Sequence, residues 1–215
     1  MSASLKISNV SKVFDKNVAL NNVSLDIQAG EFVCLLGPSG CGKSTLLRLI
    51  AGLDHPSSGR IFIGERDVTN LPPSRRNFGI MFQSYALFPN LTAFENVAYG
   101  LRNKKIRTKD IEERVNRLFD MIKLSHAKNR LPSQMSGGEQ QRVAIARALA
   151  HKPQIIFADE PTAELDSATG VKVVKIFRDL TREEGITVVM TTHDTGLMGA
   201  GDRVFSMEDG EIVDA

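Results

Sequence analysis

Apolar residues in this chain form short runs, each closed by a turn signal, and longer stretches with helical spacing separate them. The continuous runs at 32–36 and 155–158 are typical of strands buried on both faces. Alternation at 5–10 and 23–27 predicts half-buried strands, and 60–63, 78–82 and 187–191 predict three more. Residues 64–67 read as a turn, and 203–207 with 211–213 predict a hairpin around Asp209-Gly210.

Helical spacing marks five segments. One runs over 46–51 and ends at Gly52, and a second runs from about Ser167 to Glu184 and ends at Gly185. Two more open on capping boxes: Thr92 with Glu95 begins a helix to about 101, and Ser136 with Glu139 begins one through 150. The fifth, over 110–122, carries one apolar stripe that indicates packing.

Composition narrows the class of protein. A chain of 215 residues indicates one domain, with room for an inserted lobe. A net charge of +2 offers no electrostatic case for binding nucleic acid. No apolar run approaches the ~18 residues of a membrane span, and the N-terminal residues lack a signal-peptide core. Cys34 and Cys41 fit neither a disulfide nor a zinc pattern, so we expect a reducing cytosol.

The most specific motif is a phosphate-binding loop between the strand at 32–36 and the helix at 46–51. It reads Gly37-Pro38-Ser39-Gly40-Cys41-Gly42-Lys43-Ser44-Thr45 and fits the pattern G-x-x-x-x-G-K-[ST]. Its glycines leave main-chain N–H groups open to an anion, and the following helix adds its positive end. Lys43 supplies a charge for the outer phosphates, and the Ser44 hydroxyl suits Mg²⁺, which prefers oxygen ligands.

A second cluster of candidates follows the later strands. Asp159 and Glu160 end the strand at 155–158, where open parallel sheets bind ligands, and His193 ends the strand at 187–191. Adjacent carboxylates are commonly ordinary surface charge, but the apolar strand and the phosphate loop favour function. Asp159 suits a magnesium shell, and Glu160 could polarise a water molecule. Asp166 follows shortly.

Several segments support two interpretations from the residues alone. Phe14, near a turn, is either core or a platform for adenine. Ser136-Gly137-Gly138 is either a simple helix cap or a second anion site. The basic connector at 102–107 is a solvated loop or, less simply, a contact to a phosphate backbone. The apolar stretch 85–91 is filler between two lobes or the floor of a groove for a partner helix.

Taken together, these motifs resemble the nucleotide-binding subunit of an ABC transporter, over essentially the whole chain. They stand in that family's order: the phosphate loop, a Gln loop at Gln83, the signature at 136–138, the acidic strand end at 159–160, Asp166 and the switch His193. The resemblance implies an α/β fold: a P-loop NTPase core of mostly parallel sheet, an antiparallel β subdomain and an inserted helical subdomain. It implies one domain over 1–215, with the core and β subdomain in 1–83 and 152–215 and the helical signature subdomain in 84–151.

The resemblance also implies an ATPase that couples hydrolysis of Mg-ATP to solute movement. Glu160 would be the general base, with His193 and Lys43 also catalytic, and Mg²⁺ would be held by Ser44, Gln83 and Asp159. ATP would contact Gln83, the loop from Gly37 to Thr45, and Phe14, which matches the family's adenine-stacking aromatic. Asp166 would be the functional residue of the loop that follows the acidic strand. A second copy facing head to tail would supply the signature residues Ser136, Gly137, Gly138 and Glu139.

The implied partners are a homodimer or a paired ATPase subunit and transmembrane permease subunits, with a substrate-binding protein as a further candidate. The implied location is the cytoplasmic face of the membrane. Nucleic acid is not expected. An ABC protein acting on DNA or ribosomes would usually carry coiled-coil insertions, zinc modules or a tandem cassette, and none is present. A GTPase would need an N-K-x-D motif, which the sequence lacks, and a kinase would not need the signature.

The chain departs from the usual family pattern at the signature, where Met135 and Glu139 replace Leu and Gln, and at Ala163-Glu164, where Ser-Ala is usual. Glu139 could place a negative charge near the γ-phosphate and slow closure. The stretch 82–89 resembles importers of polyamines, iron or 2-aminoethylphosphonate. The stretches 158–170 and 209–213 resemble lipoprotein-release and macrolide-export ATPases.

Overall fold

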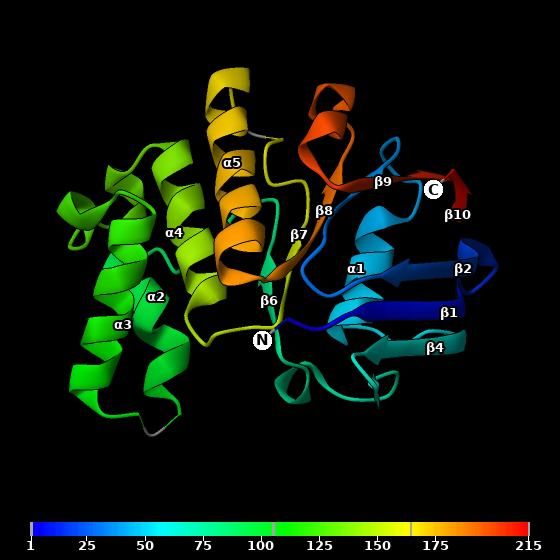
Figure 1. The fold of residues 1–215 in the computed structure, drawn as a ribbon, viewed down its shortest axis with the longest axis horizontal. Coiled ribbons are helices and arrows are strands. Elements are labelled where there is room, and N and C mark those ends of the chain that lie inside the picture. The colour runs from blue at the N-terminus through cyan, green and yellow to red at the C-terminus, as the bar shows by residue number, and fades with distance from the viewer. Residues whose placement is uncertain (1, 105, 164, 215) are drawn as a thin grey trace.

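A computed structural model describes residues 2–104, 106–163 and 165–214 of the chain. Glu164, one of the departures noted above, lies outside the described residues. The fold is α/β, as predicted, and is built on two sheets with helices around the larger one (Figure 1).

The larger sheet has six strands in the order β10-β9-β3-β8-β7-β6. Five of them run parallel, and only β10 pairs antiparallel, with β9. The central strands are uninterrupted apolar runs because helices cover both faces. The strands are β3 (Phe32–Leu36), β6 (Phe78–Met81), β7 (Ile155–Ala158), β8 (Thr187–Thr192), β9 (Arg203–Glu208) and β10 (Glu211–Asp214).

The smaller sheet is antiparallel, in the order β2-β1-β4-β5. Its strands are β1 (Leu5–Phe14), β2 (Asn17–Ile27), β4 (Ser58–Ile63) and β5 (Arg66–Asp67). The first two form one hairpin that is longer than the predicted strands and turns at Asp15, whose φ is +53°. The turn predicted over 64–67 is shorter than expected because Arg66 pairs with Ile63 and begins β5.

The described part of the chain forms five α-helices around the sheets: α1 (Lys43–Ala51), α2 (Ala93–Arg102), α3 (Thr108–Met121), α4 (Gly137–Leu149) and α5 (Ser167–Glu184). Short 3-10 segments lie at Pro73–Arg75, Ser125–Ala127, Pro132–Gln134 and Thr195–Ala200. In Figure 1, α2, α3 and α4 gather on one side of the molecule and the antiparallel sheet on the other. The subdomain boundaries at 83 and 151 stay a prediction.

The larger sheet separates two hydrophobic cores. Within β7, Ile156 and Ala158 join the core formed with α2 to α5, whereas Ile155 and Phe157 join the core formed with α1 and the antiparallel sheet. This alternation follows from the two-residue period of a strand. Burial also raises the pKa of the Cys34 thiol to about 11, so this cysteine is an inert core residue.

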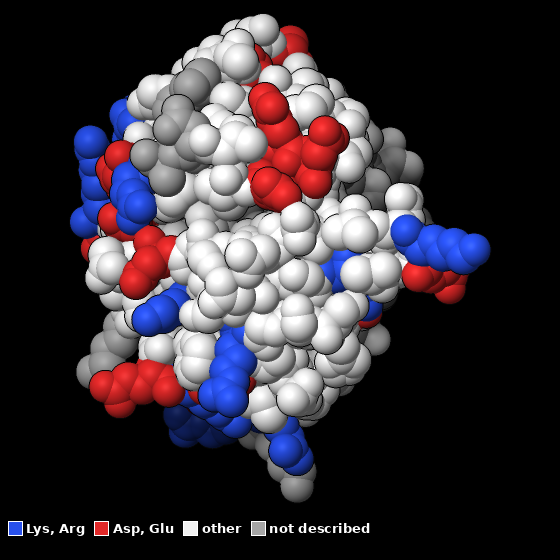
Figure 2. Space-filling view, turned by 90° about the vertical axis from the view of Figure 1, so that its right-hand side faces the viewer, with Lys and Arg blue, Asp and Glu red and all other residues white. Residues whose placement is uncertain are grey.

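The surface carries mixed charge. Figure 2 shows the face toward the antiparallel sheet and the C-terminal hairpin, where one compact group of acidic side chains lies near the top, other acidic side chains lie among Lys and Arg, and no continuous basic area is visible. In the basic connector, Arg107 forms an ion pair of 2.8 Å with Asp110. Within the described residues, no helix is both long enough and apolar enough to cross a membrane.

Candidate functional site

The phosphate loop joins the end of β3 to the start of α1, and close contacts require glycine at two of its positions, Gly37 and Gly42. A Cβ at Gly37 would lie 2.2 Å from the Met207 carbonyl oxygen. Gly42 has a φ of +105°, and a Cβ there would lie 2.7 Å from the Ala19 oxygen. Side chains at these positions would therefore displace the loop. The N-terminal end of α1 is left facing the loop, as an anion site needs.

Lys43 is held inside this loop, with only 3% of the residue exposed. Its Nζ donates to the main-chain oxygens of Gly37, at 2.7 Å, and Pro38, at 2.8 Å. The same nitrogen lies 3.7 Å from Glu160 Oε1. A buried charge needs such partners, and the cation is thereby kept between the loop and the acidic end of β7.

Asp159 lies directly after β7, and two hydroxyl groups donate to one of its oxygens. Ser44 Oγ is 3.0 Å and Thr191 Oγ1 is 2.8 Å from Asp159 Oδ1. These bonds bring the first turn of α1 and the end of β8 to the same carboxylate. The cluster offers the hard oxygen donors that Mg²⁺ prefers, so the residues present fit a magnesium ion.

Glu160 has an unusual main chain and three partners. Its φ is +45°, in the left-handed region that residues other than glycine rarely adopt. Its N–H donates to Thr191 Oγ1 at 2.9 Å. Its carboxylate lies between His193 Nδ1, at 3.0 Å from Oε2, and Lys43. The three predicted catalytic residues therefore meet at this carboxylate, although they come from α1, the end of β7 and the end of β8.

Phe14 and Gln83 are both exposed. Phe14 ends β1 and is 46% exposed, so the core interpretation is wrong. Lys12 Nζ lies 4.6 Å from the centre of its ring. Gln83 follows β6, the strand paired with β7. In the described part of the chain, neither side chain hydrogen-bonds to Asp159 or Glu160.

The signature residues begin α4, and the predicted capping box is present. Glu139 N–H donates to Ser136 Oγ, and Glu139 Oε2 accepts from Ser136 N–H at 2.8 Å and from its hydroxyl at 3.0 Å. The Ser136 N–H is the main reason that the pKa of Glu139 lies below its ordinary value. Arg130 and His126 lie 3.7 Å and 3.8 Å from Glu139 Oε1. The extra negative charge is therefore partly offset by neighbours on its own chain.

Asp166 is the N-cap of α5, a role that its position before a predicted helix could have revealed. Its carboxylate accepts from Thr169 N–H at 3.0 Å, and hydrogen bonding to Thr169 keeps the pKa of Asp166 low. Asp166 and Ser136, Gly137 and Gly138 line one pocket of about 720 Å³ between the end of α3, the start of α4 and α5. Within the described residues, the phosphate loop does not line that pocket. The signature residues and the phosphate loop therefore lie at separate places on one chain.

The stretch 85–91 contributes to a groove of about 840 Å³. Phe88 and Tyr99 line it and are 41% and 47% exposed, and their rings contact each other with centres 4.6 Å apart and planes inclined at 40°. The main chain at Phe88 is fixed by Asn96, whose amide accepts from Phe88 N–H at 2.8 Å and donates to its carbonyl oxygen at 3.1 Å. The groove is therefore a partly aromatic surface whose main chain at Phe88 is held by hydrogen bonds.

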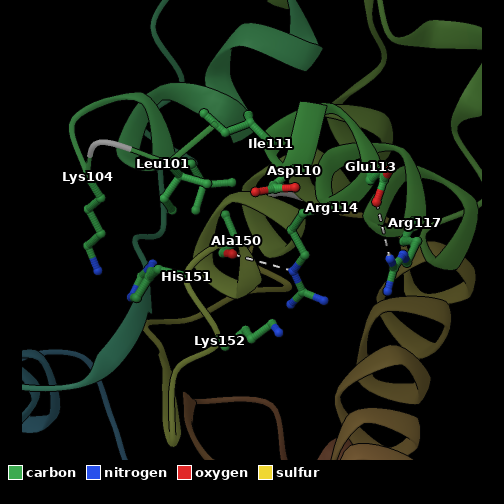
Figure 3. A pocket seen from close by; sticks show the side chains of 11 residues that line it. Leu101, Lys104, Asp110, Ile111, Glu113, Arg114, Arg117, Ala150, His151 and Lys152 are labelled. Carbon is green, nitrogen blue, oxygen red and sulfur yellow. Dashed lines mark hydrogen bonds and ion pairs between the residues drawn. The ribbon is translucent and has the colours of Figure 1, made fainter. Parts of the chain in front are cut away.

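A further pocket of about 390 Å³ lies beside α3 and the end of α4 (Figure 3). Lys104 and Lys152 line it together with Arg114, which donates to the Leu149 carbonyl oxygen at 2.9 Å. None of the predicted site residues lines this pocket. Arg114 also donates to the Ala150 carbonyl oxygen at 3.4 Å, so it pairs with the last turn of α4, whose carbonyl groups carry partial negative charge.

Thr191 is the residue at the site that sequence reasoning missed. It is fully buried, and its hydroxyl contacts both acidic residues. The available signal was a threonine two positions before His193, at the end of an apolar strand next to the acidic one.

Comparisons with known proteins identify the family of this chain. Residues 20–163 match the family described as ABC transporter. The chain is 47% identical over 210 residues to the spermidine/putrescine import ATP-binding protein PotA of Thermotoga maritima, which covers 97% of this chain and 57% of that protein. It is 47% identical over 213 residues to the sulfate/thiosulfate import ATP-binding protein CysA 2 of Chromobacterium violaceum, covering 99% and 58%. The chain thus spans a little over half the length of these relatives.

A solved structure shows the same fold. A dimeric post-hydrolysis state of the ATP-binding cassette MJ0796, bound to ADP and Pi, superposes with a TM-score of 0.87 and 41% identity. The match covers 97% of this chain and 96% of that one.

Proposed function

The chain belongs to the ABC transporter family, and from that premise we propose that it is the ATP-hydrolysing motor of a transporter. The observation that carries the proposal is the meeting of Lys43, Ser44, Asp159, Glu160 and His193 at one edge of the parallel sheet. Open parallel sheets bind ligands at this edge. A loop that presents main-chain N–H groups beside a lysine suits a nucleoside triphosphate.

The proposed reaction is hydrolysis of the terminal phosphoanhydride bond of ATP. The oxygen of a water molecule attacks the γ-phosphorus, and the bond from this phosphorus to the β–γ bridging oxygen breaks. ADP leaves with that oxygen, and the carboxylate of Glu160 takes a proton from the attacking water. His193, at 3.0 Å from Glu160, orients that carboxylate and faces the departing phosphate, while Lys43 stabilises negative charge on the phosphates.

Magnesium is the proposed cofactor. Ser44, Asp159 and Gln83 would hold it, and the first two already place oxygen donors within 3.0 Å of each other. When bound, the ion neutralises phosphate charge and orients the phosphoryl group. At the other end of the nucleotide, the exposed ring of Phe14 offers a face on which adenine would stack.

The proposed active form is a head-to-tail dimer. The signature half-site lies on a different pocket from the phosphate loop, so a second copy would complete each site with Ser136, Gly137, Gly138 and Glu139. The N-terminus of α4 would then point its free N–H groups at the γ-phosphate of the facing chain. The dimeric state of MJ0796 supports this arrangement.

Membrane permease subunits are the proposed partners, docked in the groove that contains Phe88 and Tyr99. The chain would then act at the cytoplasmic face of the membrane. Import is the proposed direction, supported by relatives described as import ATP-binding proteins. These relatives serve polyamines and sulfate, which carry opposite charges, so the solute would be chosen by other subunits, a substrate-binding protein among them. The subdomain boundaries at 83 and 151 belong to the same proposal.

Substitution Glu160→Gln tests the reaction. The amide keeps the shape of the side chain but cannot take a proton, so kcat should fall about 100- to 10,000-fold while ATP affinity is kept. The variant should also accumulate as an ATP-bound dimer in size-exclusion chromatography with Mg-ATP. Glu65→Gln, an exposed position in the turn between β4 and β5, is the matched control. Near-normal hydrolysis by Glu160→Gln would remove Glu160 from its assigned role.

A further inference from the structure

Thr191 occupies a junction between the two acidic residues. It is completely buried near the C-terminal end of β8, the strand between β3 and β7. Its hydroxyl donates to Asp159 Oδ1 at 2.8 Å and accepts from Glu160 N–H at 2.9 Å. A hydroxyl has one proton to give and can still accept, so both bonds form at once.

The register of the sheet explains why this residue reaches both partners. Ala158, the last residue of β7, pairs with Met190 of β8, so the next residue on each strand is Asp159 and Thr191. At this point β7 ends and its chain turns away, while β8 continues to Thr192. A short side chain on β8 therefore faces the first residues that follow β7.

The main chain of Glu160 needs an anchor of this kind. Its φ of +45° is costly for a residue with a Cβ and persists only where the surroundings enforce it. The bond from Glu160 N–H to Thr191 is the contact that holds the amide in this conformation. The direction of the Glu160 carboxylate, between His193 and Lys43, follows from the direction of its main chain.

The hydroxyl oxygen of Thr191 also restrains the carboxylate of Asp159. Its Oδ1 accepts from both Thr191 and Ser44. Two donors on one oxygen fix the rotation of the carboxylate, and its second oxygen accepts neither bond. A single buried hydroxyl thus sets the side chain of one acidic residue and the main chain of the other.

We propose that Thr191 is a positioning residue for ATP hydrolysis, acting through Asp159 and Glu160 together. The inference rests on the proposed ATPase function. It assigns to Thr191 no contact with the nucleotide. Its hydroxyl fixes the position of Asp159, the proposed magnesium ligand, relative to Glu160, the proposed general base. The water activated by Glu160 is thereby aligned with the phosphoryl group bound to the magnesium ion.

The chain offers an unusually close control at the other end of the same strand. Thr187 is also fully buried, lies on the same face of β8, and makes the same pair of bonds: its hydroxyl accepts from Gly30 N–H at 2.9 Å and donates to the Ala3 carbonyl oxygen at 2.8 Å. The substitutions Thr191→Val and Thr187→Val remove equivalent bonds with the same change of shape. A purely structural role predicts equal effects from the two.

The experiment compares the wild-type chain with Thr191→Val, Thr191→Ser and Thr187→Val. For Thr191→Val we expect kcat to fall about 10- to 100-fold, with KM for ATP changed less than about threefold, because two hydrogen bonds that orient the reacting groups are lost. Thr191→Val should also need a higher Mg²⁺ concentration than wild type for half-maximal binding of a fluorescent ATP analogue. This titration tests the metal site without depending on turnover. Thr191→Ser should recover most of both, and Thr187→Val should lower the melting temperature with kcat within about twofold of wild type.

Equal kcat in Thr191→Val and Thr187→Val would overturn the proposal, as would a Thr191→Val variant with normal kcat and normal Mg²⁺ dependence. Thr191→Ala, a smaller side chain, serves if the valine variant does not fold. If neither variant folds while Thr187→Val does, the residue serves folding and the proposal is wrong. A wild-type chain without Mg-ATP hydrolysis would instead refute the proposed function, so the two failures are distinguishable.

Discussion

Substitution Phe88→Asp separates folding from docking, because Phe88 is partly covered in the free chain and would be fully covered by a docked helix. Phe88 is 41% exposed, so roughly 120 Å² of a ~200 Å² residue surface is already out of water. Losing that contact costs about 2 to 3 kcal/mol of folding free energy. Stabilities of about 5 to 15 kcal/mol leave the variant folded, and its melting temperature should fall by about 5 to 10 °C.

The main chain should survive the substitution. The amide of Asn96 holds both the N–H and the carbonyl of residue 88, and these bonds do not depend on the side chain. Basal ATP hydrolysis by the isolated variant should stay within about twofold of wild type, since the groove lies outside the cluster around Glu160.

Docking should suffer far more. The partner helix would have to cover an aspartate, and removing its charge from water costs several kcal/mol in addition to the lost apolar contact. A loss of about 4 kcal/mol weakens the complex about 1,000-fold. We therefore expect the variant to lose co-purification with membrane subunits and transport in reconstituted vesicles.

Three measurements on one preparation decide the matter: melting temperature, basal hydrolysis and vesicle transport. Leu53→Asp, at a residue that is 45% exposed and outside the groove, is the matched control and should keep transport. Unfolding of Phe88→Asp would show that the stretch 85–91 is only filler between lobes. Normal transport by a folded variant would place the docking site elsewhere.

Three further predictions concern other parts of the chain. Mixing Lys43→Ala with Ser136→Arg should restore up to about a quarter of wild-type hydrolysis, because half of the dimers are then mixed and each mixed dimer holds one intact site of two. Activity no greater than that of the separate variants would contradict a composite site. Glu139→Gln keeps the capping box but removes the negative charge beside the Ser136 hydroxyl. We expect kcat to rise about two- to fivefold at an unchanged melting temperature, and an unchanged or lower kcat would refute this. Burial lowers the pKa of His151, which donates to the Phe78 carbonyl oxygen. The unfolded chain therefore takes up the proton first below about pH 6.5, and stability is lost on acidification. Between about pH 7.5 and pH 5.5, the melting temperature of wild type should fall further than that of His151→Gln, and equal slopes would refute the reasoning.

Local features were predictable from the sequence because their causes are local. The left-handed ends of α1 and α5 follow from Gly52 and Gly185. The capping boxes at the starts of α2 and α4 follow from residue types three positions apart. The phosphate loop follows from glycine and lysine spacing between a strand and a helix, and the family resemblance then supplied the order of the remaining motifs.

The relations between motifs were decided by the tertiary structure. Ser44, Asp159 and Thr191 are distant in the chain and meet only because β7, β8 and β3 are neighbours with matching C-terminal ends. No local pattern encodes strand order, so Thr191 read as an ordinary strand residue. The resemblance assigns Ser136 to the site of a second copy, and its place in this chain likewise depends on packing: α4 packs against α2 and α3 and presents Ser136 to a pocket that, within the described residues, the phosphate loop does not line.

The sequence by itself therefore determined which chemical groups this protein carries and which local structures present them, because spacing and side-chain type control turns, caps and loops. Only the tertiary structure decided which of those groups share one hydrogen-bonded cluster, that Glu160 adopts a left-handed main chain, and that the signature residues line a pocket apart from that cluster. The physical reason is that apolar side chains on both faces of one sheet must be buried in two cores, which determines the order of the strands. The strand order in turn determines which residues at the strand ends lie next to each other.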